Sequence, residues 1–280
     1  MRLKTGTLKT GSGRFSLALP KGHAVGEIPI WYHLPGDLPP DSRIVIVLHG
    51  TSRAAEASRD NWRHPAEDNR FAVVVPHFEK QHFSDAAYAY GNFWAPAPPF
   101  TPVAWERSHG AILDLLFDAV NAALGWNKTA FTLYGHSAGA AFAHRYLALA
   151  PQDRVEQAVV ANAGWYSLLE PGKPIPLGFQ GCDQPVARVR HLLEKDITVL
   201  IGERDISGPY PDWWPESYLE QGPHRFARSL SFFRSAEDLA RRFSVPFNWR
   251  WESVPGVGHE NAKMIAPAAR LLARRGAVTL

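Results

Sequence analysis

The chain has 280 residues, 45% of them hydrophobic, and is long enough to bury a large core without disulfides or structural metals. Its 30 basic and 27 acidic residues leave a formal charge of only +3, which gives no reason to expect a nucleic-acid partner. The one cysteine, Cys182, excludes an intrachain disulfide and has no motif around it that would indicate a nucleophile.

Targeting and cofactor signals are absent from the sequence. No run of roughly 18 uncharged apolar residues predicts a membrane span, and residues 1–13 lack the apolar core of a signal peptide, so a cytoplasmic location is the default expectation. The 12 histidines are scattered without an H-E-x-x-H pattern, and no Gly-rich phosphate loop occurs. We therefore expect neither a metal nor a nucleotide cofactor.

Strands and helices alternate along most of the chain. The runs at 14–20 and 28–35 are short, bounded by Gly and Pro, and suited to the edge of a sheet. Residues 43–50 and 71–77 are uninterrupted apolar runs, typical of strands covered on both faces. Further strands are expected at 131–134, 154–161, 196–205 and 247–254. Helices are expected at 60–68, 105–124, 140–149, 186–194, 225–243 and 261–275.

Two aromatic segments interrupt this pattern. Residues 79–102 are expected to form a long surface loop, and the length and aromatic content of such a loop favour a functional role. Residues 207–222 are interpreted as a second inserted loop. No repeat or linker divides the chain, which predicts one α/β domain over residues 1–280, a parallel sheet with right-handed crossovers and helices on both faces.

The strongest motif lies at Gly135-His-Ser-Ala-Gly139, between a predicted strand and a predicted helix. This context makes G-x-S-x-G typical of a nucleophile elbow, in which a strained turn lifts Ser137 above the sheet edge. Glycines are needed at 135 and 139 because the two backbones approach too closely for a β-carbon. A serine that only caps a helix is the alternative, and the matching flanks favour the nucleophile.

A serine hydroxyl needs a positioned base, and behind this type of elbow the acid and then the histidine follow in the chain. His259 lies in a glycine-rich loop after a predicted strand, where its ring can reach Ser137. Asp205 ends the 196–205 strand and can orient the imidazole. Glu203 is the second candidate for the acid, and Asp183 is the third.

Two backbone N–H groups are needed to hold a developing oxyanion. We expect one from Ala138, directly after the serine, and one from Thr51, in the His-Gly-Thr loop that follows the 43–50 strand. His49 and His136 sit in tight turns and are interpreted as structural.

The sequence contains 10 tryptophans, a high number. Trp94, Trp165, Trp213 and Trp214 fall on loops predicted to face the site, and aromatic walls suit an acyl chain or an aromatic ester. For any single tryptophan, ordinary core packing is an equally good interpretation.

Together, the elbow, the His-Gly-Thr loop, Gly-Glu-Arg-Asp205 and Gly-Val-Gly-His259 resemble the α/β-hydrolase superfamily from about Ile44 onward. Within it, the chain is similar to bacterial poly(3-hydroxybutyrate) depolymerases and related esterases. That similarity is carried by residues 48–53, 59–62, 90–92, 134–139, 161–166 and 257–263.

The resemblance implies an eight-stranded, mostly parallel sheet, a Ser137–Asp205–His259 triad, and ester hydrolysis through an acyl-enzyme. The chain lacks the polymer-binding domain and paired cysteines of secreted polymer-degrading members, which favours a soluble small-molecule or oligomeric ester. An amidase or peptidase with the same triad is the main alternative. A binding protein that has lost the chemistry is the third interpretation.

Overall fold

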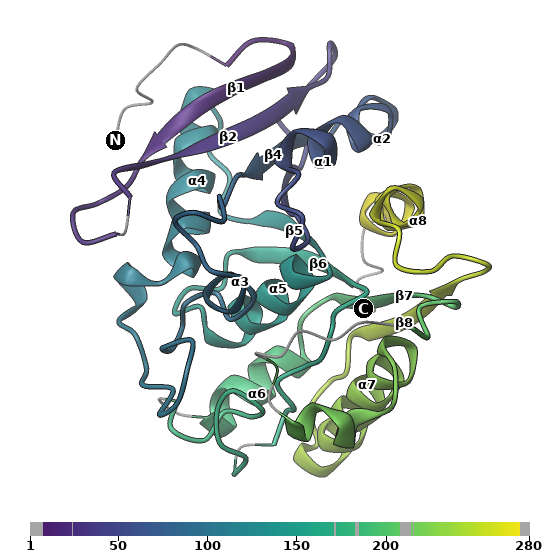
Figure 1. The fold of residues 1–280 in the computed structure, drawn as a ribbon. Coiled ribbons are helices and arrows are strands. Elements are labelled where there is room, and N and C mark those ends of the chain that lie inside the picture. Colours follow the sequence, from purple (N-terminus) through teal and green to yellow (C-terminus); the bar gives the residue numbers. More distant parts are fainter. Residues whose placement is uncertain are drawn as a thin grey trace.

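The computed structural model describes residues 8–23, 25–170, 172–182, 185–207, 214 and 216–274. Its centre is one eight-stranded sheet in the order β1-β2-β4-β3-β5-β6-β7-β8 (Figure 1). The strands are β1 Gly11–Ala18, β2 Glu27–Leu34, β3 Ile44–Leu48, β4 Ala72–Pro76, β5 Phe131–His136, β6 Val155–Ala161, β7 Ile197–Gly202 and β8 Trp249–Val254. β2 runs antiparallel to both of its neighbours, and every other pairing is parallel, as expected for an α/β-hydrolase.

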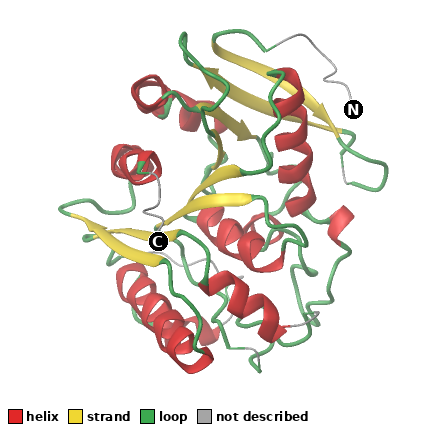
Figure 2. Ribbon diagram, turned by 180° about the vertical axis from the view of Figure 1, so that it is seen from behind, coloured by secondary structure: helices red, strands yellow, loops and turns green. Residues whose placement is uncertain are grey.

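Helices cover both faces of this sheet (Figures 1 and 2). They are α1 Ala55–Asn61, α2 Arg63–Asn69, α3 Asp85–Ala89, α4 His109–Ala123, α5 Ala138–Leu149, α6 Pro185–Leu193, α7 Arg225–Phe243 and α8 Asn261–Ala273, with short 3-10 turns at η1 Trp105–Arg107 and η2 Glu216–Gln221. One hydrophobic core joins the sheet to α4, α5, α6 and α7. A second, smaller core lies on the other face under α1, α2 and α8.

The uninterrupted apolar runs form the central strands, as predicted. All residues of β3, β4, β5 and β7 are buried. Parallel strands with helices on both faces have no solvated side, so their sequences show no polar alternation. Among the described residues, none of the helices combines the length and the apolar character that crossing a membrane requires.

The structure corrects three expectations about individual elements. β2 is not at the edge of the sheet, because it pairs with both β1 and β4. Pro29 is tolerated there because the pairing with β4 begins only at Ile30, so the missing N–H of the proline costs no hydrogen bond to β4. The helix expected at 60–68 is two helices that start at Ala55. A separate 3-10 turn precedes α4, because the Ser108 side chain caps that helix by accepting from the Ala111 amide.

The segment 79–102 is a surface loop only in part: residues 80–82, 84, 96–99 and 101–102 are exposed. It contains α3, and its aromatic side chains are buried under the helices of the larger core: Tyr88, Tyr90, Phe93 and Trp94 are all less than 7% exposed. Their rings contact each other and Phe142 of α5. Aromatic content in this segment therefore serves packing, which an argument from loop length cannot anticipate.

The turn between β5 and α5 is held by the close approach of backbones. Ser137 has φ 56° and ψ −116°, a strained combination for a residue with a β-carbon. A β-carbon at Gly135 would collide with the carbonyl group of Gly139, and one at Gly139 would collide with the carbonyl groups of Leu48 and His49. Gly135 therefore lets the start of α5 rest on the end of β5, and Gly139 lets it rest on the end of β3.

Replacing Gly139 by alanine is expected to lower the free energy of unfolding by about 1–3 kcal/mol, because the new methyl group forces backbones apart. Chemical denaturation measures this. Gly36→Ala is the matched control: nothing lies within 4 Å of a β-carbon at Gly36, so its unfolding free energy should stay within about 0.5 kcal/mol of the parent. Equal effects from the two substitutions would contradict the packing argument.

Candidate active site

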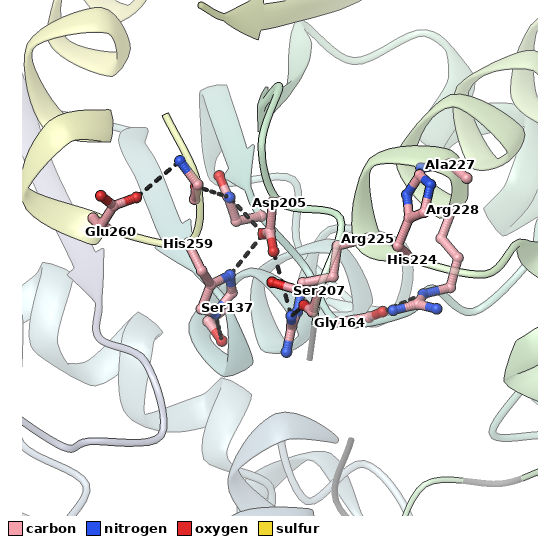
Figure 3. A network of polar contacts seen from close by, with 12 residues as sticks. Ser137, Gly164, Asp205, Ser207, His224, Arg225, Ala227, Arg228, His259 and Glu260 are labelled. Atoms are coloured by element: carbon pink, nitrogen blue, oxygen red, sulfur yellow. Dashed lines mark hydrogen bonds and ion pairs between the residues drawn. The ribbon is translucent and has the colours of Figure 1, made fainter. Parts of the chain in front are cut away.

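Three side chains from separate loops form one hydrogen-bonded line (Figure 3). His259 Nε2 lies 2.9 Å from the Ser137 hydroxyl oxygen, and His259 Nδ1 lies 2.7 Å from Asp205 Oδ2. With the proton on Nδ1, the ring donates to the carboxylate and accepts from the hydroxyl. Ser137 precedes α5, Asp205 follows β7 and His259 follows β8. The parallel strands end at the same edge of the sheet, which is why residues so far apart in the chain meet.

Asp205 is a buried carboxylate with several donors. Its side chain is about 1% exposed. Asn162 Nδ2 donates to Oδ2 at 2.7 Å, and an Arg225 nitrogen lies 3.3 Å from Oδ1. Burial by itself raises the pKa of Asp205, but the hydrogen bond and charge of His259, with Arg225 and Asn162, outweigh burial and hold the pKa below its ordinary value.

Glu203, the second candidate for the acid, is not in this line. Glu203 is exposed and accepts a hydrogen bond from the Ser253 hydroxyl at 3.0 Å. Asp183 lies outside the described residues.

Asn162 is a site residue that sequence reasoning missed. It follows β6, has a left-handed φ of 52°, and donates both to Asp205 and to the Gly258 carbonyl oxygen at 3.0 Å. One amide thus ties the acid to the loop that carries His259. Its position directly after a buried strand at the carboxyl edge of the sheet is the signal that could have identified it.

Thr51 and Ala138, the expected oxyanion donors, line the same cavity as Ser137. Ala138 is the first residue of α5, so its amide belongs to the helix end that carries partial positive charge. No acceptor for the amide of Thr51 or Ala138 occurs within the described part of the chain.

The two neighbouring histidines are buried: His49 directly follows β3, and His136 is the last residue of β5, not part of a turn as expected. His49 Nδ1 donates to the Gly50 carbonyl oxygen (3.0 Å), and its Nε2 accepts from the Phe78 amide (3.3 Å). Burial lowers the pKa of both His49 and His136 to about 3, so both rings are neutral near pH 7.

Arg53 holds the loop that carries Thr51, a role that was not predicted from the sequence. The guanidinium donates to the carbonyl oxygens of Phe78 (2.6 Å) and Phe83 (3.0 Å), pairs with Asp85 at 3.1 Å, and lies 4.1 Å from the centre of the Tyr88 ring. This buried arginine joins the loop after β3 to the segment around α3.

A cavity of about 320 Å³ opens beside Ser137. It is lined by Thr51, Ala89, Ser137, Ala138, Ala141, Gly164, Trp165, Trp214, Arg225 and His259. Of the four tryptophans predicted to bind substrate, Trp165 and Trp214 line it. Trp94 does not: it is 1% exposed and packs against Tyr90 and Phe93 in the core. Trp213 lies outside the described residues.

Among the residues that the structure describes, no three His, Cys, Asp or Glu side chains are grouped so that they could hold a metal ion. The chemistry that the arrangement offers is that of a base-activated hydroxyl beside an apolar cavity.

Asp205 is expected to make stability depend on pH. Because its pKa in the fold is below the ordinary value of about 3.9, the carboxylate stabilises the native state above that pH, and this contribution is lost as the pH falls through the folded-state pKa. In Asp205→Asn, the unfolding free energy measured by denaturation should be lower than in the parent at neutral pH. The difference should shrink between about pH 5 and pH 2.

Asp37→Asn is the control for this titration, because the Asp37 side chain is 77% exposed and its ion pair with Arg70 lies at the surface. Parallel stability curves for the parent and Asp205→Asn below pH 5 would show that Asp205 is not the titrating group.

Solved structures resemble this chain over nearly its whole length. Poly(aspartic acid) hydrolase-1 from Sphingomonas sp. KT-1 is 29% identical with a TM-score of 0.87, over 95% of this chain and 100% of that one. LpqC, a poly(3-hydroxybutyrate) depolymerase from Bordetella parapertussis, is 26% identical with a TM-score of 0.84, over 94% of this chain and 90% of that one.

An S-formylglutathione hydrolase from Agrobacterium tumefaciens, 13% identical with a TM-score of 0.59 over 97% of each chain, is similar in fold alone. No protein-family model and no curated protein sequence matches the chain. Given the sheet, the elbow and these similarities, we conclude that the chain is a serine hydrolase with the α/β-hydrolase fold, and that it resembles poly(3-hydroxybutyrate) depolymerases and esterases.

Proposed function

We propose that the chain hydrolyses carboxylic esters through an acyl-enzyme formed on Ser137. The observation that carries this proposal is the unbroken hydrogen-bonded line from Asp205 through His259 to the Ser137 hydroxyl, which ends at a cavity wall. A hydroxyl becomes a useful nucleophile only when a positioned base accepts its proton, and this geometry provides that base.

In the first half of the reaction, His259 Nε2 takes the Ser137 proton while the serine oxygen attacks the ester carbonyl carbon. Ionised Asp205 stabilises the imidazolium that forms. The imidazolium then gives its proton to the alcohol oxygen, the bond between the carbonyl carbon and that oxygen breaks, and the acyl group stays on Ser137. In the second half, His259 takes a proton from water while the water oxygen attacks the acyl carbon. The imidazolium then returns that proton to the Ser137 oxygen as its bond to the acyl carbon breaks, and the carboxylic acid is released.

The amides of Thr51 and Ala138 are assigned to the carbonyl oxygen as it becomes negative. Both residues border the cavity beside Ser137, and donors fixed in advance need no reorganisation when charge develops. Arg53 and His49 hold the loop that carries Thr51 by the contacts described above.

The substrate class is inferred from the cavity. Trp165, Trp214 and three alanines give it largely apolar walls, which suit an aliphatic acyl chain. We assign to it soluble hydroxyalkanoate esters or short oligomers, an assignment supported by the likeness to a poly(3-hydroxybutyrate) depolymerase at 26% identity.

Amide hydrolysis is the second candidate, and one observation favours it. The similar structure with 29% identity is a poly(aspartic acid) hydrolase, and poly(aspartic acid) is a polymer of amino-acid units. Ester and amide cleavage pass through the same tetrahedral intermediate, so the same residues would act in both.

Ser137→Ala is expected to lower kcat for 4-nitrophenyl butyrate by about 10³ to 10⁶, because the acyl-enzyme cannot form. Ser231→Ala, on the exposed side of α7, is the matched control and should keep the parent rate. A Ser137→Ala variant that hydrolyses this ester near the parent rate would eliminate the proposed mechanism.

Matched substrates separate the two candidate functions. The two substrates are a butanoyl ester and the butanoyl amide that differs from it only in having N–H in place of the ester oxygen. We expect turnover of the ester and little of the amide, since an amine is a poorer leaving group than an alcohol. The rate of acid release measures both. Faster cleavage of the amide would make the chain an amidase, with Ser137 in the same role.

A further inference from the structure

A buried arginine lies directly behind the wall of the cavity. Ala141 and Arg145 are four residues apart and share one side of α5, whose N-cap is Ser137. Side chains on a helix lean toward its N-terminus, so Arg145 extends back toward the cavity. Its guanidinium donates to the carbonyl oxygens of Ala141 (2.8 Å) and Ala89 (3.2 Å), and both of these residues line the cavity.

Arg145 has no carboxylate partner among the described residues. Nε donates to the Ser167 hydroxyl at 2.9 Å, and the guanidinium carbon lies 4.3 Å from the ring centre of Trp165, another cavity residue. The side chain is fully buried, and Nη2 has no hydrogen-bond partner within the described part of the chain. Burial lowers the pKa of Arg145 to about 9, which leaves it protonated at neutral pH.

The cavity wall carries no carboxylate that would offset this charge. Its lining residues, as far as the structure describes them, include no aspartate or glutamate, and the charge of the lining residue Arg225 is paired with Asp205 at 3.3 Å. The carboxylate of Asp205 stands behind His259 and already accepts hydrogen bonds from His259, Asn162 and Arg225 (Figure 3). The N-terminal end of α5 also directs partial positive charge toward Ser137.

We propose that this positive field makes the cavity selective for substrates that carry a carboxylate near the scissile bond, with Arg145 as a specificity-determining residue behind the wall formed by Ala141 and Trp165. The inference rests on the proposed hydrolysis at Ser137. A buried cation without a counter-ion is costly, and an anion bound nearby recovers part of that cost. A neutral substrate of the same shape makes the same apolar contacts without this gain.

Either side of an ester can supply the carboxylate. It lies on the acyl side in the half-ester of a dicarboxylic acid, and on the alcohol side at the free-acid end of a hydroxy-acid oligomer. Two substrate pairs distinguish these sources, each matching a carboxylate with its neutral primary amide. The first is monoethyl adipate against the ethyl ester of adipic acid monoamide. The second is 3-butanoyloxybutanoate against 3-butanoyloxybutanamide.

The first measurement is kcat/KM of the parent protein for all four compounds. We expect the anionic member of at least one pair to be favoured about tenfold, a modest effect for a charge pair at partly screened distance. Equal values, or a preference for the neutral amide in both pairs, would overturn the inference. Hydrolysis of the neutral esters by the parent but not by Ser137→Ala would leave the proposed function standing even then.

The second measurement assigns the preference to Arg145. Arg145→Met and Arg145→Gln remove the charge, and the anionic-to-neutral ratio should fall about tenfold in whichever variant folds, while Arg145→Lys should retain most of it. Arg190→Met is the control: Arg190 also binds a carbonyl oxygen and lies over the Phe243 ring, but it is exposed on α6.

An unchanged ratio in a folded, uncharged Arg145 variant would exclude this residue as the source of selectivity, and so would an equal loss in Arg190→Met. The parent ratios need no variant, so they decide the substrate preference even if the uncharged variants do not fold.

Discussion

The contact between the first turn of α5 and the end of β3 is the constraint on which the rest of the site depends. It exists because positions 135 and 139 carry no β-carbon, so that carbonyl groups and helix backbone can touch. The approach fixes the strained conformation of Ser137, brings the loop with Thr51 beside the helix N-terminus, and leaves a cavity at their junction. Strain of this kind, about 1–3 kcal/mol, persists only because the packing around it is tight on both faces of the sheet.

The protein buries a carboxylate and two arginines near this contact, and it stabilises them in different ways. Asp205 stays ionised in a buried place because His259, Asn162 and Arg225 all donate to it. Arg53 and Arg145, by contrast, donate to backbone carbonyl oxygens and lie against aromatic rings. The carboxylate therefore serves the imidazole, while the buried arginines join loops together; the charge of Arg53 is paired with Asp85, and that of Arg145 has no carboxylate partner among the described residues.

How far the sequence predicted the structure depended on how local each signal is. The central strands were predicted because a strand covered on both faces must be apolar throughout, and the elbow because its turn requires glycine. The prediction for the aromatic residues around Trp94 was wrong for the converse reason: their burial comes from contacts with residues far along the chain, such as that of Phe93 with Phe142 of α5. Aromatic residues suit a cavity wall and a core equally well, so composition could not separate the two.

By itself, the sequence determined the fold class, the strained serine turn, and the order in which a serine, a carboxylate and a histidine follow buried strands. Only the tertiary structure decided that Asp205 rather than Glu203 meets His259, that Asn162 joins the acid to the histidine loop, and that Arg145 stands behind the cavity. The reason is physical: local backbone requirements leave a mark on neighbouring residues, whereas the pairing of side chains from separate loops depends on the register and twist of the whole sheet.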